Sequence, residues 1–280
     1  MMMASPHSQG RLDVFLRSAH LTPELARTCE SLGFNTLWIG GSPKGDLKLA
    51  GELLDATSTI TIAAAVVNIW QYRPELVAAA FHRVEERHPG RFLLGIGPGH
   101  PEVDVASYAK PYDALCRYLD TLDNRGVPGD RRVLGALGPR VLRLAAERTA
   151  GAHPYLVTPE HTRRARGLMG KSALLVPVQL VVAESDSRRA RDIARRAVAR
   201  PYLALSNYIA SLRALGFTEQ DLAGTGSDEL IDALVAHGDP AAVATRLDAH
   251  LLAGADRVAV EVARAPQQSP ETVYPAFASD

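Results

Sequence analysis

Residues 91–100, Arg-Phe-Leu-Leu-Gly-Ile-Gly-Pro-Gly-His, decide how the rest of the chain is interpreted. The apolar run 92–96 has no polar alternation and is bounded by turn residues, which predicts a buried strand. The glycine turn 97–99 and His100 follow at once. Glycines at a strand's carboxyl end let the backbone approach a ligand, and a histidine there can bind or titrate. A dinucleotide fingerprint is rejected, because a proline-containing turn follows where that motif needs a helix.

The same strand-then-helix order recurs along the chain without a break in composition. We expect strands at residues 12–16, 35–39, 60–67, 92–96, 132–137, 152–157, 174–182 and 257–262. We expect helices at residues 23–33, 47–56, 74–87, 112–122, 141–150, 159–169, 187–200, 208–215, 229–236 and 240–252.

Uninterrupted alternation of this kind indicates a parallel α/β sheet with right-handed crossovers. Eight units in 280 residues favour a closed (β/α)8 TIM barrel over a doubly wound open sheet. The sequence therefore predicts a single domain over residues 1–280, with a core at about 12–263 and loosely held termini at 1–10 and 266–280.

Composition excludes several classes of partner. Lys+Arg and Asp+Glu are balanced at 31 each, which gives no reason to expect a nucleic-acid partner. No apolar run approaches the roughly 18 residues of a membrane span, and the polar start lacks a signal peptide's apolar segment. His82 and Glu86 share a helix face but have no third ligand in view, so no metal site is expected. We expect a cytoplasmic protein without a membrane or nucleic-acid partner.

Two helix starts are candidate anion sites. Gly138-Pro139-Arg140 would leave backbone N–H groups open at a helix amino terminus, where the helix dipole favours negative charge. Thr158-Pro159 has the same form one unit later. The alternatives are an ordinary turn at Gly138 and a simple helix cap at Thr158. Asn68 and His100 add polar side chains where strands end.

The chain resembles the luciferase-like monooxygenase superfamily, in its coenzyme F420-dependent oxidoreductase branch. The order and spacing of the matching segments extend from about residue 13 to 262. The segments that carry the resemblance are residues 32–39, 62–68 with 73–74, 89–99, 136–140 and 151–158.

The resemblance implies a TIM barrel that holds the deazaflavin at the carboxyl ends of its strands. It also implies a bulge with a non-prolyl cis peptide at Ala65–Val66 behind the ring, and a cofactor phosphate at the helix that begins near Gly138. The cofactor-binding residues implied in this way are Ala65, Val66, Val67, Gly97, Gly99, Gly138, Pro139, Arg140 and Thr158.

The chain also departs from the family pattern. Sugar-phosphate dehydrogenases of the family have a catalytic histidine at the end of the second strand, where this chain has Gly40-Gly41-Ser42. Their acidic residue after the fourth-strand glycines is replaced by His100. Their acid–base pair is therefore absent, and their substrate is not assumed.

These observations predict an enzyme that moves a hydride between C5 of F420 and an unidentified small organic substrate. His100 and Asn68 are the expected catalytic residues: His100 handles a proton, or only binds the ring's carbonyl edge, and Asn68 supplies a polarising hydrogen bond. An FMN-dependent monooxygenase and a non-catalytic F420- or anion-binding barrel are the alternatives. The resemblance further implies a homodimer.

Overall fold

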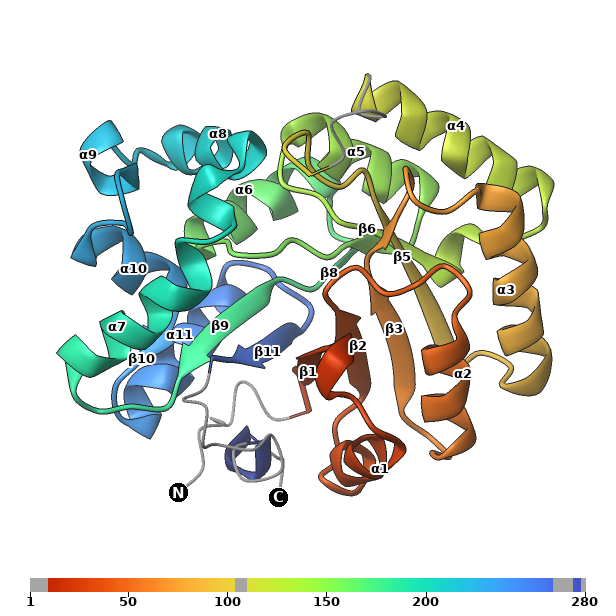
Figure 1. Cartoon of the computed structure of the whole chain (residues 1–280), viewed down its shortest axis with the longest axis horizontal. Helices are drawn as coiled ribbons and strands as arrows, with labels where there is room; N and C mark the ends of the chain where they lie inside the picture. Colours follow the sequence, from red (N-terminus) through yellow and green to blue (C-terminus); the bar gives the residue numbers. More distant parts are fainter. Residues whose placement is uncertain (1–9, 104–109, 264–273, 278–280) are drawn as a thin grey trace.

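A computed structural model describes residues 10–103, 110–263 and 274–277. Strands form the centre of the molecule and helices lie outside them (Figure 1). The strands are β1 (Leu12–Arg17), β2 (Thr36–Gly40), β3 (Thr61–Ala65), β4 (Val67–Asn68), β5 (Phe92–Gly97), β6 (Arg132–Leu134), β7 (Gly151–Ala152), β8 (Leu174–Leu175), β9 (Val178–Val182), β10 (Val235–His237) and β11 (Val258–Val262). The helices are α1 (Pro23–Ser31), α2 (Lys48–Asp55), α3 (Pro74–Arg87), α4 (Pro111–Asn124), α5 (Pro139–Arg148), α6 (Pro159–Met169), α7 (Ser187–Val198), α8 (Ser206–Leu215), α9 (Glu219–Leu222), α10 (Asp228–Leu234) and α11 (Pro240–Leu252).

All neighbouring strands are parallel, and the sheet runs β9-β11-β1-β2-β3-β5-β6-β7-β8. The segment 174–182 closes this path into a ring. Residues 174–178 pair with β7 and the loop after it, where Val178 N donates to Pro154 O at 2.9 Å. Residues 177–182 pair with β11, where Ala259 N donates to Pro177 O at 2.9 Å. The single α/β barrel of parallel strands predicted from the sequence is confirmed.

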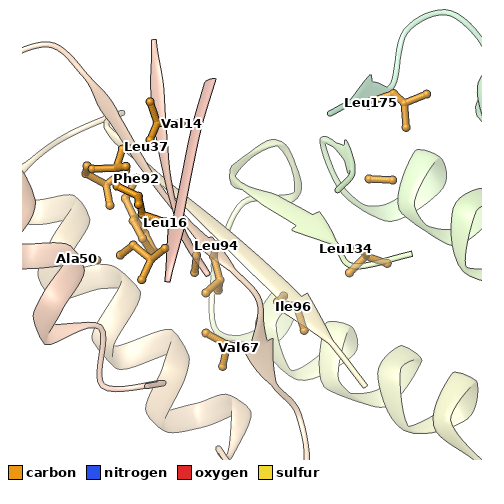
Figure 2. Packing of buried hydrophobic residues seen from close by; sticks show 14 of the residues in the cluster. Val14, Leu16, Leu37, Ala50, Val67, Phe92, Leu94, Ile96, Leu134 and Leu175 are labelled. Carbon is orange, nitrogen blue, oxygen red and sulfur yellow. The ribbon is translucent and has the colours of Figure 1, made fainter. Parts of the chain in front are cut away.

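Side chains of alternate strand residues face opposite ways, as the pleat requires. Those that face the helices form the main apolar cluster, and Figure 2 shows Val14 of β1, Leu37 of β2 and Phe92 of β5 gathered together. The residues between them face the barrel interior, where Phe15 and Trp38 belong to a separate buried cluster. In β1 this alternation places Asp13, Phe15 and Arg17 on the inner side of the barrel.

Local sequence explains where the helices begin. Helices α1, α3, α4, α5, α6 and α11 each have proline in their first turn, where the missing N–H costs no hydrogen bond. Thr22 caps α1 by accepting a hydrogen bond from Leu25 N. In the part of the chain that the structure describes, no helix has both the length and the apolar character needed to cross a membrane.

Two expectations are corrected. The helix expected over 229–236 ends at Leu234, and Val235–His237 form β10, which pairs with β9. Within the tail expected to be loose, Tyr274 is buried and its hydroxyl donates to Phe15 O at 2.9 Å. Through this contact, the described part of the tail, residues 274–277, packs against β1.

Candidate functional site

A cavity of about 380 Å³ opens at the carboxyl ends of the strands. Its wall takes residues from the ends of β1, β3, β5 and β6 and from the loop after β7, and a covering segment, 202–208, contributes Tyr202 and Tyr208. A barrel places its chemistry at this end, because the loops after the strands converge there. The volume is in the range of small-molecule sites, about 300–1,000 Å³.

The bulge after β3 forms one wall. The Ala65–Val66 peptide is cis, at the bond that the resemblance indicated. Val66 lies on the cavity wall against two glycines: a Cβ added at Gly97 would lie 2.6 Å from Val66 Cγ2, and one at Gly135 would lie 3.3 Å away. The two glycines thus leave room for the side chain of Val66. This side chain forms an aliphatic surface, the Val66 ledge, that a flat ring can contact.

The turn after β5 forms the next wall. Gly99 has φ +59°, a conformation that glycine adopts without the usual steric cost. Trp70 Nε1 donates to Pro98 O at 2.5 Å and Trp70 N donates to Asn68 Oδ1 at 2.9 Å, so the turn is tied to the bulge. His100 Nδ1 lies 3.2 Å from Asn207 Oδ1 of α8. The predicted catalytic pair, Asn68 and His100, therefore lies on one cavity wall.

The amino terminus of α5 forms a positively polarised corner. Its N-cap, Gly138, supplies no side-chain hydrogen bond, and a Cβ there would meet nothing within 4 Å. Arg140 lies on the cavity wall with its guanidinium carbon 4.0 Å from the ring centroid of Tyr112. Open N–H groups, a helix dipole and a guanidinium together suit a phosphate.

Most predicted site residues line this cavity, and three do not. Val67 points outward into the cluster of Figure 2 and is fully buried there. Pro139 begins α5 but does not line the wall. Thr158 is buried, and its Oγ1 accepts a hydrogen bond from His161 N, so the first turn of α6 is capped by the protein itself. The residues that do line the wall are Ala65, Val66, Asn68, Gly97, Gly99, His100, Gly138 and Arg140.

The sequence reasoning missed a charged cluster at the end of β1. Arg17 Nε donates to Glu261 Oε1 at 3.1 Å, and Nη2 lies 3.2 Å from the hydroxyl of Tyr202 and 3.4 Å from that of Tyr155. Burial raises the pKa of Glu261, against the lowering effect of Arg17 and Tyr155. Burial alone would lower the pKa of Arg17, but Glu261 and the two tyrosines hold it above its ordinary value. The alternation of side chains along β1 and β11 could have predicted this cluster, because Arg17 and Glu261 both fall on inward positions.

A second group that the sequence did not predict as part of the site lies at the cavity floor, where His153 lines the cavity. The ring of His153 stacks on Trp38 at 3.8 Å between centroids, and Trp38 Nε1 donates to buried Asp13 at 3.0 Å. Burial lowers the pKa of His153 to about 3 and raises that of Asp13 to about 6. Among the described residues, neither ring nitrogen of His153, which lines the cavity, has a hydrogen-bond partner of good geometry. The imidazole of His153 is thus neutral, and it forms part of the cavity floor. Within the described ranges, no cluster of three or more potential metal ligands occurs.

Comparison with known proteins supports the resemblance to the luciferase-like monooxygenases. Residues 2–121 match the model of the luciferase-like monooxygenase family. A 5,10-methylenetetrahydromethanopterin reductase of Archaeoglobus fulgidus is 25% identical, in an alignment covering 83% of this chain and 86% of the relative.

Solved structures agree on the fold. An F420-dependent secondary alcohol dehydrogenase in complex with an F420–acetone adduct superposes with a TM-score of 0.72 at 14% identity, over 96% of each chain. The FMN-bound oxygenating constituent of 3,6-diketocamphane monooxygenase from Pseudomonas putida superposes with a TM-score of 0.67 at 14% identity, over 90% of this chain and 91% of the other. The resemblance to the luciferase-like monooxygenases is confirmed, and the family and its structural neighbours are oxidoreductases and monooxygenases.

Proposed function

We propose that this chain, whose residues 2–121 match the luciferase-like monooxygenase family, is an F420-dependent oxidoreductase acting on a small organic substrate. The observation that carries the proposal is the pairing, in one cavity, of the Val66 ledge with the open amino terminus of α5. The ledge fits a planar ring and the helix terminus fits a phosphate. The alcohol dehydrogenase of the same fold is an F420 enzyme, which supports this choice of cofactor.

Each part of the cofactor has a matching surface. Val66, supported by Gly97 and Gly135, would lie against the deazaflavin ring. Backbone N–H groups of the first turn of α5, with Arg140, would hold the phosphate. When bound, F420 supplies a hydride donor or acceptor at C5 of its ring, and the protein orients it.

The remaining residues of the chain position the substrate and the proton. Asn207 orients the imidazole of His100 through its Nδ1 contact, and the imidazole would exchange a proton with a substrate oxygen or nitrogen. Asn68 lines the cavity and accepts a hydrogen bond from Trp70 N, and it would supply the polarising hydrogen bond. The segment 202–208, which lines the cavity through Tyr202, Asn207 and Tyr208, would exclude water from it. We further propose that the protein acts in the cytoplasm as a homodimer.

Turnover tests the redox function. Reduced F420 is incubated without oxygen with the protein and a panel of ketones, enones and imines, and the return of the oxidised cofactor's absorbance is followed. Protein-dependent oxidation with stoichiometric product supports the proposal. Turnover only with reduced FMN and O₂ would favour the monooxygenase, which the FMN-bound neighbour keeps as the second candidate. Tight F420 binding without turnover of any compound would favour a non-catalytic binder.

A further inference from the structure

We propose that the cavity contains a carboxylate-binding subsite centred on Arg17, and that the substrate is a carboxylic acid with a conjugated or aromatic body. This inference rests on the proposed function for the identity of the cofactor. The subsite itself follows from the residues at the end of β1 and in the segment 202–208, which no part of the cofactor argument uses.

Arg17 is held in place by the protein and still accessible to a ligand. Its Nε donates to Glu261, whose side chain is only 10% accessible, whereas 43% of the Arg17 side chain remains accessible on the cavity wall. A buried carboxylate that orients a guanidinium lowers the entropic cost of binding a second anion. Arg17 is thus prepared for a ligand before one arrives.

The donors of Arg17 are only partly used. Nε meets Glu261 and Nη2 meets the hydroxyls of Tyr155 and Tyr202. No hydrogen bond from Nη1 occurs among the described residues. Because Tyr202 accepts from Arg17, its own O–H is left to donate, and guanidinium plus phenol can bind the two oxygens of a carboxylate.

The surface around Arg17 favours a flat ligand. Neighbouring aromatic rings run from Phe15 to Tyr155 at 5.7 Å, to Tyr202 at 5.0 Å, to Tyr208 at 5.0 Å and on to His100 at 5.6 Å. Such an arc stacks favourably on conjugated groups. It also leads from Arg17 to His100, so a carboxylate bound at one end would leave the reacting part near the other.

This subsite is separate from the phosphate corner. On the closed ring, β1 and β6 are separated by β2, β3 and β5 on one side and by β7, the 174–182 segment and β11 on the other. Arg17 ends β1, and Arg140 follows β6. The two guanidiniums therefore approach the cavity from opposite sides of the barrel, one for the substrate and one for the cofactor.

A crossed binding experiment tests the inference. Dissociation constants of trans-cinnamate and of uncharged cinnamamide are measured by calorimetry in the presence of saturating F420, and that of F420 is measured alone. The wild type should bind cinnamate at least about tenfold more tightly than cinnamamide, because charge-assisted hydrogen bonds contribute that much. Arg17→Gln should remove this preference and leave F420 affinity unchanged. Arg140→Gln should do the reverse, and Arg143→Gln, on the exposed face of α5, should change neither.

Three results would overturn the subsite: no measurable cinnamate binding, equal affinity for the two probes, or an Arg17→Gln variant that loses F420 and keeps cinnamate. If the wild type fails to bind F420, the proposed cofactor is wrong, and the same titration on the apo-protein still decides the subsite. Because Arg17→Gln leaves Glu261 without its partner, Arg17→Gln/Glu261→Gln serves as the second variant. It should fold and show the same lost preference.

Discussion

Gly97 is the residue where packing and the cofactor surface meet. An added Cβ would lie 2.6 Å from Val66 Cγ2, so Gly97→Ala must push the ledge toward the ring position. We expect a loss of about 1–3 kcal/mol in the free energy of unfolding and weaker F420 binding. Gly51→Ala is the matched control, since nothing lies within 4 Å of its added Cβ in α2. If the folded Gly97→Ala variant bound F420 with unchanged affinity, Val66 would not be part of the surface that contacts the ring.

His100 separates the two roles that the sequence leaves open. If it transfers the proton, His100→Ala should lower kcat by about 10²–10⁴-fold and change the F420 dissociation constant little. If it only binds the ring edge, F420 affinity should fall and kcat should not. His82→Ala on the exposed face of α3 is the control. Stopped-flow rates and equilibrium titration on the same preparations distinguish these outcomes.

The helix amino termini show what distinguishes a ligand site from a cap. In α6 the Thr158 hydroxyl accepts from His161 N, whereas Gly138 gives α5 no side-chain cap. Thr158→Ala should therefore destabilise the fold by about 1 kcal/mol and leave F420 binding unchanged. Thermal unfolding and F420 titration check this together. A tenfold loss of F420 affinity in this variant would return Thr158 to the cofactor site.

At the scale of elements, hydrophobic periodicity and the prolines and glycines at helix ends predicted the helices well. The helix expected at 74–87 has those bounds in the structure, because Pro74 fixes its start and an amphipathic pattern fills it. The strand Val235–His237 was missed because Leu234-Val235-Ala236 continues an apolar helical pattern, and only pairing with β9 decides its conformation. Arg17, Tyr202 and Tyr155 meet across long sequence separations, which no local pattern specifies.

Two buried histidines link the whole fold to pH. Burial lowers the pKa of both His153 and His250 to about 3, while an unfolded histidine titrates near 6.5. Between these values the unfolded chain binds more protons, so stability falls as the pH is lowered through this window. Each histidine should cost about 2 kcal/mol at pH 5 relative to pH 7. Asp13, with its pKa raised to about 6, acts in the opposite direction over part of the window.

His250→Gln isolates one contribution. His250 lies between Thr162 Oγ1 at 2.8 Å and Gln179 Oε1 at 3.0 Å, and glutamine can replace both hydrogen bonds without titrating. Urea unfolding at pH 7 and pH 5 should show a loss on acidification about 2 kcal/mol smaller in the variant than in the wild type. An equal loss in both proteins would show that His250 becomes protonated within the fold.

The central claim, that this barrel cavity is an F420 site, is tested most directly by equilibrium binding to the apo-protein, with F420 and FMN titrated separately. Trp38 stacks on the cavity-floor His153 and Trp70 bonds the glycine turn, so a ligand in the cavity should quench both indoles. We predict micromolar or tighter F420 binding, weakened at least about tenfold in Arg140→Gln, with FMN bound more weakly. Preferential binding of FMN, or quenching by neither cofactor, would contradict the account.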